Sequence, residues 1–191
     1  MTETARQKPE PAFAGAARLR PLTIDELSSV RYLHAVSIKR LAASHLSEAE
    51  LVAFCAYVNS DAYTERLAEQ VRNDRLIGAI LMDELVATAA WSPANDSGGV
   101  ARLMAVCVSP LYALNGLGRL VVAAAETEAR KAGFQVFTTR APIGAIEFFA
   151  RLGYEVASHG VWTLPSGEPI PVGFMRKLAT PDARLSAAIQ D

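Results

Sequence analysis

The chain has 191 residues, of which 51% are hydrophobic, and a formal net charge of −1 from 19 basic and 20 acidic residues. This length and composition predict one globular domain, and the balanced charge excludes the broad basic surface of a general nucleic-acid-binding protein. The longest apolar runs, such as residues 51–58, are far too short to span a bilayer, so we expect no membrane partner.

The expected organisation is a single domain over 17–178, preceded by a disordered arm over 1–16 and followed by a tail over 179–191. The first residues hold scattered charges and prolines rather than the apolar core of a secretory signal, so we expect a cytoplasmic protein. Two cysteines, Cys55 and Cys107, fit a reducing compartment better than a disulfide framework. The three histidines show no ligand spacing with these cysteines, so we expect no metal site.

The first half of the domain predicts one short strand followed by helices. Two capping boxes, Thr23-x-x-Glu26 and Ser47-x-x-Glu50, each pair the first backbone N–H groups of a helix with side-chain oxygens. From these boxes and the apolar spacing we expect a strand over 17–20 and helices over 23–42, 47–58 and 62–72.

In the second half, strands and helices alternate in an irregular order. Asp83-Glu84 separates two apolar runs and predicts a hairpin turn, while Gly133 and Gly153 stand where left-handed helix ends are expected. We expect strands over 75–82 and 85–91, a polar loop over 93–99, a central strand over 101–108, a helix over 117–131, a strand over 134–138, a helix over 143–152 opened by Pro142, and strands over 154–164 and 170–178 joined by a turn at 165–168.

The most informative segment is 106–119, which reads V-C-V-S-P-L-Y-A-L-N-G-L-G-R. It contains the end of an apolar strand, a Ser-Pro step, a turn with two glycines, and the start of a helix. The first N–H groups of a helix have no internal partners and carry the positive end of the helix dipole. Because glycines let an anion approach that backbone closely, the segment predicts a phosphate-binding turn.

This segment resembles the acyl-CoA pyrophosphate loop of the GNAT acetyltransferase superfamily. In that family a strand ending Val-x-Pro leads into Arg/Gln-x-x-Gly-x-Gly/Ala and then a helix. Val108, Pro110, Gly116 and Gly118 match this register, whereas Ala113 stands where arginine or glutamine is usual.

A second segment, 145–154, resembles the other recognisable segment of the family, Asn-x-x-Ala-x-x-Phe-Tyr-x-x-x-Gly-Phe. Phe149 stands at the position of the family's tyrosine, which can protonate the leaving thiolate, and Pro142 stands at that of its asparagine. The order of strands and helices over 17–178 is also similar to the family's. The resemblance implies an α/β fold with a central mixed sheet and helices on both faces.

The resemblance further implies acetyl-CoA as the acyl donor, lying between the strands expected over 103–108 and 134–138. A backbone N–H around 106–108 is expected to hold the developing oxyanion. The expected donor-binding residues are Val106, Cys107, Val108, Ala113, Leu114, Asn115, Gly116, Leu117, Gly118, Arg119 and Thr139.

The sequence assigns no catalytic base. An alkylamine with a lysine-like pKa near ~10.4 is mostly protonated at neutral pH and needs a base or a desolvating site, yet the strand over 101–108 holds no carboxylate. Candidate bases elsewhere are His45, Glu48, Asp96, Tyr112 and Thr139, and a structural role is the simpler interpretation of each.

Other residues near the expected site also have a simpler structural interpretation. Cys107 lies in an apolar strand with no visible base, so we expect a small buried hydrophobe rather than an acyl carrier. Trp91 and Trp162 are candidates for lining an acceptor pocket, with packing in the core or at a strand edge as the simpler interpretation. Arg102 and Arg140 are candidates for holding an acidic substrate or the CoA 3′-phosphate, with solvated surface as the simpler interpretation.

Three functions stay open at this point. The first is acyl transfer, with acetyl as the expected group, to a small-molecule amine or a peptide by direct attack. The second is a non-catalytic protein that binds acyl-CoA, which the residues at 113, 142 and 149 favour. The third is an unrelated nucleotide-binding domain, which expects an acidic ribose contact, whereas Glu126 and Glu128 are expected on the solvent face of their helix. Dimers are common in the resembled family, so a homodimer also stays open.

Overall fold

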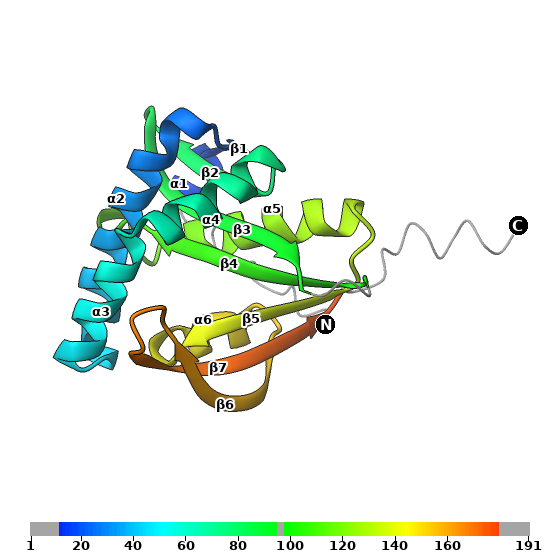
Figure 1. Ribbon diagram of the computed structural model, residues 1–191. Coiled ribbons are helices and arrows are strands. Elements are labelled where there is room, and N and C mark those ends of the chain that lie inside the picture. Colours follow the sequence, from blue (N-terminus) through cyan, green and yellow to red (C-terminus); the bar gives the residue numbers. More distant parts are fainter. Residues whose placement is uncertain (1–11, 95–97, 180–191) are drawn as a thin grey trace, which may run out of the picture.

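The computed structural model describes residues 12–94 and 98–179, which build one seven-stranded sheet with helices on both faces (Figure 1). The strands are β1 Arg18–Pro21, β2 Leu76–Leu81, β3 Glu84–Pro93, β4 Val100–Val108, β5 Val136–Pro142, β6 Glu155–Thr163 and β7 Pro169–Leu178. They lie in the order β1-β2-β3-β4-β5-β7-β6, in which β4 and β5 are parallel and every other neighbouring pair is antiparallel. This architecture confirms the expected mixed α/β fold.

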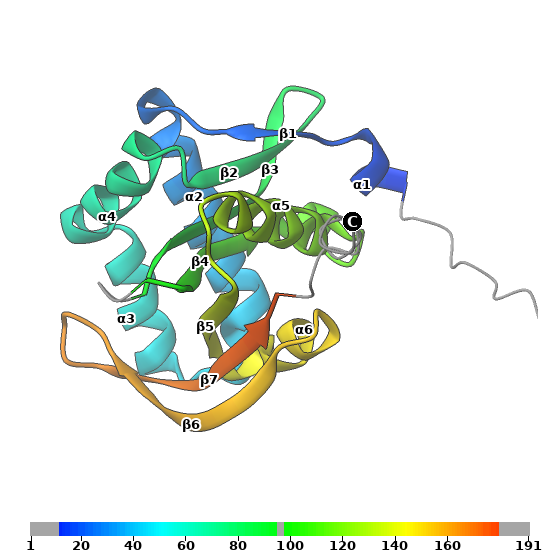
Figure 2. The same cartoon turned by 90° about the vertical axis from the view of Figure 1, so that its right-hand side faces the viewer.

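The helices pack against the sheet from two sides. The α-helices of the described residues are α1 Ala12–Ala16, α2 Leu27–Ser37, α3 Glu48–Val58, α4 Asp61–Arg72, α5 Leu117–Lys131 and α6 Ile146–Arg151. α5 packs against β2, β3 and β4, while α2 and α4 contact β3 from the opposite face. Figure 2 shows α3 and α4 on one side of β4 and β5, and α6 on the other. None of the helices described has the length and apolar character that crossing a membrane requires.

Buried hydrophobic clusters on both faces of the sheet hold these layers together. Val121 of α5 packs with Leu103 of β4 and Phe137 of β5 on one face. On the other face, Val30 of α2 and Leu67 of α4 form a second buried cluster. Because strand side chains alternate between faces, β2, β3 and β4 each contribute to both clusters, which fixes their register.

The two parallel strands pair over only part of their length. β4 and β5 are neighbours from Val100 with Val136 to Leu103 with Thr139. Beyond that point β4 stays paired with β3, and β5 stays paired with β7. The strands therefore diverge toward their carboxyl ends and leave a wedge in the middle of the sheet.

Most expected elements are confirmed, and the differences have local causes. The helix over 117–131 begins and ends as expected, and Gly133 and Gly153 have φ angles of 93° and 86°. The hairpin turn lies at Met82-Asp83, one residue earlier than expected, where both residues have positive φ. Such a two-residue turn matches the twist of the strands it joins.

Two expected helix boundaries are wrong. The helix expected over 23–42 is a 3₁₀ turn at Ile24–Glu26, then α2, then a π-helical turn at Ile38–Ala42. Pro142 does not open a helix but ends β5, with φ −50° and ψ 150°, opposite Val172 of β7. A proline without an N–H is tolerated there because strand pairing ends at this residue.

The segment expected to be a disordered arm contains α1. Phe13 packs edge-on against Tyr112, with ring centroids 5.7 Å apart, and anchors this five-residue helix to the turn before α5. The expectation for residues 1–11 and for 180–191 falls outside the described residues.

Glu126 corrects the expectation that both acids of α5 face solvent. Glu126 is 4% exposed, and its carboxylate accepts hydrogen bonds from Lys177 at 2.8 Å and from the Tyr154 hydroxyl at 2.8 Å. Lys177 also lies over the Tyr154 ring, 5.3 Å from its centroid. This group ties α5 to β7, whereas Glu128 forms only a surface pair with Lys131.

We predict that Glu126→Ala lowers the free energy of unfolding by about 3 kcal/mol, because it leaves the Lys177 cation partly buried without a partner. Glu128→Ala, on the same helix, is the matched control and changes it by about 0.5 kcal/mol or less. Urea unfolding of the three proteins measures both. Equal effects of the two substitutions would contradict this role of Glu126.

Candidate functional site

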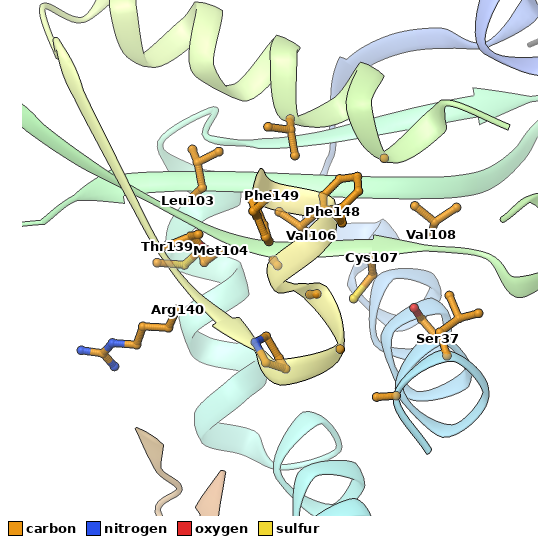
Figure 3. A pocket seen from close by; sticks show the side chains of 18 of the residues that line it. Ser37, Leu103, Met104, Val106, Cys107, Val108, Thr139, Arg140, Phe148 and Phe149 are labelled. Atoms are coloured by element: carbon orange, nitrogen blue, oxygen red, sulfur yellow. The ribbon is translucent and has the colours of Figure 1, made fainter. Parts of the chain in front are cut away.

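A cavity of about 1480 Å³ occupies the wedge between β4 and β5. Its wall includes residues of α2, α3 and α4 on one side and of α5 and α6 on the other, so it passes through the plane of the sheet. Figure 3 shows β4 running along it, with Phe148 and Phe149 of α6 near Val106. Ligand pockets usually have volumes of about 300–1,000 Å³, so this cavity has room for two ligands that meet in the wedge.

The turn between β4 and α5 forms one end of the cavity. The Ser109 N–H donates to the Val86 carbonyl at 2.8 Å, and the Asn115 amide donates to the Ala113 carbonyl at 3.0 Å. Leu114 and Gly116 have φ angles of 64° and 77°, so the chain turns sharply into the helix. Of the expected donor-binding residues, all except Asn115 line the cavity.

The first turn of α5 has an electrostatic character that favours an anion. Gly116 at the N-cap supplies no side-chain acceptor, and the first helical turn holds no acidic residue. Arg119 is instead exposed there and lines the cavity. A cation at a helix N-terminus is disfavoured by the dipole, so a bound anion would satisfy both the N–H groups and Arg119.

Gly118 is required for packing as well as for access. A Cβ at this position would lie 3.0 Å from the Phe148 ring and 3.4 Å from a methyl group of Val108. The absence of a side chain therefore lets α5 lie directly on α6 and β4. The sequence motif identifies this glycine, but its contact with Phe148 follows only from the fold.

β4 contains a bulge next to the cavity. Its register against β3 shifts between Thr88 and Ala90, and Ala105 has φ 53°. The Thr88 hydroxyl donates to the Ala105 carbonyl at 2.8 Å. The left-handed conformation costs an alanine roughly 1–2 kcal/mol, so this hydrogen bond holds the strand in a shape it would not adopt alone.

A buried histidine fixes the position of Thr88. His34 Nε2 lies 2.7 Å from the Thr88 hydroxyl, and Nδ1 lies 2.7 Å from the Tyr63 hydroxyl. Because Thr88 donates its proton to Ala105, it accepts from Nε2–H, and the unprotonated Nδ1 accepts from Tyr63. Complete burial lowers the pKa of His34 to about 3, so the imidazole is neutral and donates one hydrogen bond while accepting another.

Cys107 also faces the cavity, next to Ser37 (Figure 3). Burial raises the pKa of its thiol to about 12, against a smaller opposing effect of the Ser37 hydroxyl. The thiol is therefore protonated at neutral pH, whereas the thiolate is the nucleophilic form.

The candidate bases lie in different surroundings. His45 lines the cavity, and its ring packs so closely on Gly144 that a Cβ there would collide with it. Thr139 is buried where β4 and β5 stop pairing. Tyr112 lies outside the cavity lining, and its hydroxyl donates to Glu84 at 3.3 Å.

Other candidate residues have structural roles or fall outside the description. Glu48 lies in the exposed first turn of α3, outside the cavity lining, and Asp96 lies outside the described residues. Trp91 packs on Phe134, with ring centroids 5.4 Å apart, which confirms its expected place in the core. Among the described residues, no three His, Cys, Asp or Glu side chains gather as metal ligands.

Arginine and aromatic side chains form the cavity wall on the side of α2–α4. Arg102 and Arg140 line it, and Arg66 of α4, which the sequence gave no reason to select, joins them. Trp162 of β6 also lines it, and Tyr57 packs edge-on against Trp162 at 5.4 Å.

The sequence profile of the Acetyltransferase (GNAT) family matches residues 42–154, which include the wedge, the turn into α5 and α6. The chain belongs to the GNAT family. A comparison with curated proteins finds no significant match.

Solved GNAT structures share the fold. A GCN5-related N-acetyltransferase from Rhodopseudomonas palustris is 25% identical, with a TM-score of 0.74 over 85% of this chain and 96% of that one. The PaiA N-acetyltransferase of Thermoplasma acidophilum, in complex with coenzyme A, is 17% identical, with a TM-score of 0.66 over 85% and 98%. The yncA protein of Salmonella typhimurium, with its cofactor acetyl-CoA, is 16% identical, with a TM-score of 0.62 over 87% and 98%.

We predict that His34 makes stability depend on pH. Its folded pKa of about 3 lies below the ordinary histidine value near ~6.5, so between these pH values the unfolded chain binds a proton that the folded GNAT domain does not. Stability from this group is complete above pH ~6.5 and falls as pH drops, by up to about 1.4 kcal/mol per pH unit.

Unfolding of the wild type and His34→Gln from pH 7 to pH 4 measures this slope. We expect a shallower acid dependence in His34→Gln, and an unchanged one in His159→Gln, which removes an exposed histidine of β6. If His34→Gln does not fold, an NMR titration of the wild type gives the same answer. An imidazole that titrates above pH 5 would contradict the prediction.

Proposed function

We propose that this GNAT protein transfers an acetyl group from acetyl-CoA to an amine by direct attack. The observation that carries the proposal is the cavity through the β4–β5 wedge, with an uncapped, acid-free helix N-terminus at one end. The CoA complexes of the PaiA and yncA proteins support this choice of donor. Both Cys55 and Cys107 are free thiols, which supports a reducing compartment such as the cytoplasm.

The donor would lie along β4 with its phosphates at the turn into α5. The pyrophosphate would accept hydrogen bonds from the N–H groups of residues 116–119 and pair with Arg119. The pantetheine arm would pass between β4 and β5 beside Thr139, which lines the cavity. The thioester would then reach the bulge of β4, where a backbone N–H of residues 106–108 would hold its carbonyl oxygen.

The reaction would need little from side-chain acids. The amine nitrogen forms a bond to the carbonyl carbon, the carbon–sulfur bond breaks, and the sulfur leaves with its electron pair. A thiol pKa near ~8.5 makes this thiolate a fair leaving group, so Phe149 in place of a tyrosine is tolerable. The departing thiolate would take up the proton that the nitrogen loses after it attacks.

The incoming amine must be neutral to attack. The cavity wall is largely apolar, and desolvation lowers the pKa of an ammonium group. Among the described cavity residues, Glu126 is the one carboxylate, and Lys177 and Tyr154 already occupy it. We propose His45, at the cavity edge, as the base, because histidine is the residue type that most often serves in this role.

The phosphate assignment predicts opposite effects of one substitution on stability and affinity. Arg119→Glu puts an acid in the first turn of α5, which the dipole favours by about 0.3–1 kcal/mol. The same change replaces attraction by repulsion at the pyrophosphate, so CoA affinity falls about 10- to 100-fold. Thermal unfolding and calorimetric titration with CoA measure the two effects.

Arg18→Glu is the charge-matched control, since Arg18 is exposed on β1 at the edge of the sheet. Its CoA affinity should match that of the wild type. Equal affinities of Arg119→Glu and Arg18→Glu would exclude α5 as the phosphate site.

Acyl transfer itself predicts release of free CoA that depends on an added amine. The assay follows thiol release from acetyl-CoA with amino acids, polyamines, aminoglycosides and peptide N-termini, and mass spectrometry identifies the acetylated product. His45→Gln should retain acetyl-CoA binding and lower kcat. Tight CoA binding without release in any of these reactions would favour a binding protein over an enzyme.

A further inference from the structure

Three arginines from three separate elements meet in the wall of the cavity. Arg66 comes from α4, Arg102 from β4 and Arg140 from β5, and each is partly buried. Burial and the charges of Arg140 and Arg66 together lower the pKa of Arg102, so the three guanidinium groups act on one another. They are far apart in the sequence and are brought together by the fold.

These charges have no compensating partner among the described residues. The ion pairs of residues 12–94 and 98–179 involve Arg20, Arg72, Lys131, Arg151 and Lys177, and none of the three arginines. Glu126, the carboxylate that lines the cavity, is held by Lys177. Like charges in partly buried positions repel one another, and an anionic ligand is what would offset that repulsion.

The arginines lie on the side of the sheet away from α5. Leu103 and Phe137 belong to the core beneath α5, and strand side chains alternate between faces. Arg102 and Arg140, each an odd number of residues from these two, therefore face α2–α4. The helix N-terminus proposed for the donor phosphates begins α5, on the opposite face.

The wall around the arginines is aromatic. Arg66 is close enough to Tyr63 for its charge to oppose the rise in the pKa of that phenol. Tyr63 packs on Tyr57 at 5.0 Å, and Tyr57 packs on Trp162 at 5.4 Å. This wall offers an apolar surface directly beside the positive charges.

We propose that the acceptor is an amine that also carries an anionic group, a carboxylate or a phosphate, bound by Arg66, Arg102 and Arg140. Its apolar part would lie against Tyr57 and Trp162, which leaves the amine directed to the wedge. This inference rests on the proposed acyl transfer. Arginine suits the task because its planar donors bind carboxylate and phosphate in pairs.

Pairs of acceptors that differ in the anion alone test this inference. The carboxylate arm compares L-phenylalanine with 2-phenylethylamine and L-leucine with 3-methylbutylamine. The phosphate arm compares O-phosphoethanolamine with ethanolamine. In at least one arm, kcat/KM should be about 10- to 100-fold higher for the anionic member, which is the range expected for a charged hydrogen bond.

Substitutions in the arginine group should abolish that preference. Arg102→Gln and the double variant Arg102→Gln/Arg140→Gln should bring the ratio of kcat/KM values toward one, chiefly through KM for the anionic member. Arg72→Gln, an exposed arginine on α4 that pairs with Glu65, is the control and should keep the preference. An unchanged ratio in folded Arg102→Gln overturns the proposal.

The cofactor gives a second discriminating measurement. If the arginines instead bound the 3′-phosphate of CoA, Arg102→Gln would weaken binding of acetyl-CoA but not of 3′-dephospho-acetyl-CoA, and the acceptor proposal would fail. We expect Arg102→Gln to leave the affinity for both unchanged.

Acceptor binding separates this proposal from the proposed activity. Calorimetric titration of the CoA-loaded protein with the same amines measures binding without turnover. If the anionic amine binds in an Arg102-dependent way in this titration, yet no CoA is released from acetyl-CoA in the activity assay, acyl transfer is refuted and the anion site is supported. Equally fast acetylation of neutral and anionic amines would support acyl transfer and refute the anion site.

Discussion

The early end of pairing between β4 and β5 is the constraint on which the site depends. Four residue pairs join these strands, from Val100 with Val136 to Leu103 with Thr139, and each strand then follows its other neighbour. The cost of opening a sheet is kept low because β3 and β7 continue to pair with the separated strands. The cavity is therefore bordered by strands whose ladders hold it open, which is a more rigid setting than a cleft between loops.

A buried hydrogen-bond network holds the bulge of β4 in place beside the opening between β4 and β5. His34, Thr88 and the Ala105 carbonyl form a chain of hydrogen bonds from α2 through β3 to the bulge. A neutral His34 is needed for this chain, because protonation of Nδ1 would remove the acceptor that Tyr63 uses. Burial lowers the pKa enough to keep that state, so the same desolvation that would make His34 a poor proton acceptor makes it a reliable structural element.

Local patterns in the sequence predicted the structural features that depend on residues close together in the chain. The Ser47 capping box, the extent of α5 and the left-handed Gly133 follow from side chains within a few positions of each other. The motif in 106–119 predicted donor-binding residues; most of them line the cavity, and donor binding itself stays a prediction.

Features that depend on contacts between residues far apart in the chain could not be predicted from local sequence patterns. Glu126 is an acid on a helix otherwise amphipathic in pattern, and its burial depends on Tyr154 and Lys177, 28 and 51 residues away. His34 has no signal in α2 that distinguishes it from a surface histidine, since its partner Thr88 is 54 residues away. Arg66 is unremarkable on α4 until β4 and β5 place two further arginines beside it.

The charge of the cavity also differs from that of the whole chain. The formal net charge is −1, yet the described residues that line the cavity include five arginines and one lysine against one glutamate. The arginines are Arg66, Arg102, Arg119, Arg140 and Arg151.

A positive potential in a low-dielectric cavity attracts anions and strengthens each contact made inside it. Bound CoA would bring several negative charges into this space, and an anionic acceptor would bring more, so two such ligands would repel each other without these arginines. Their division between the helix N-terminus and the opposite face of the sheet would hold the two anions apart while their reactive ends meet in the wedge.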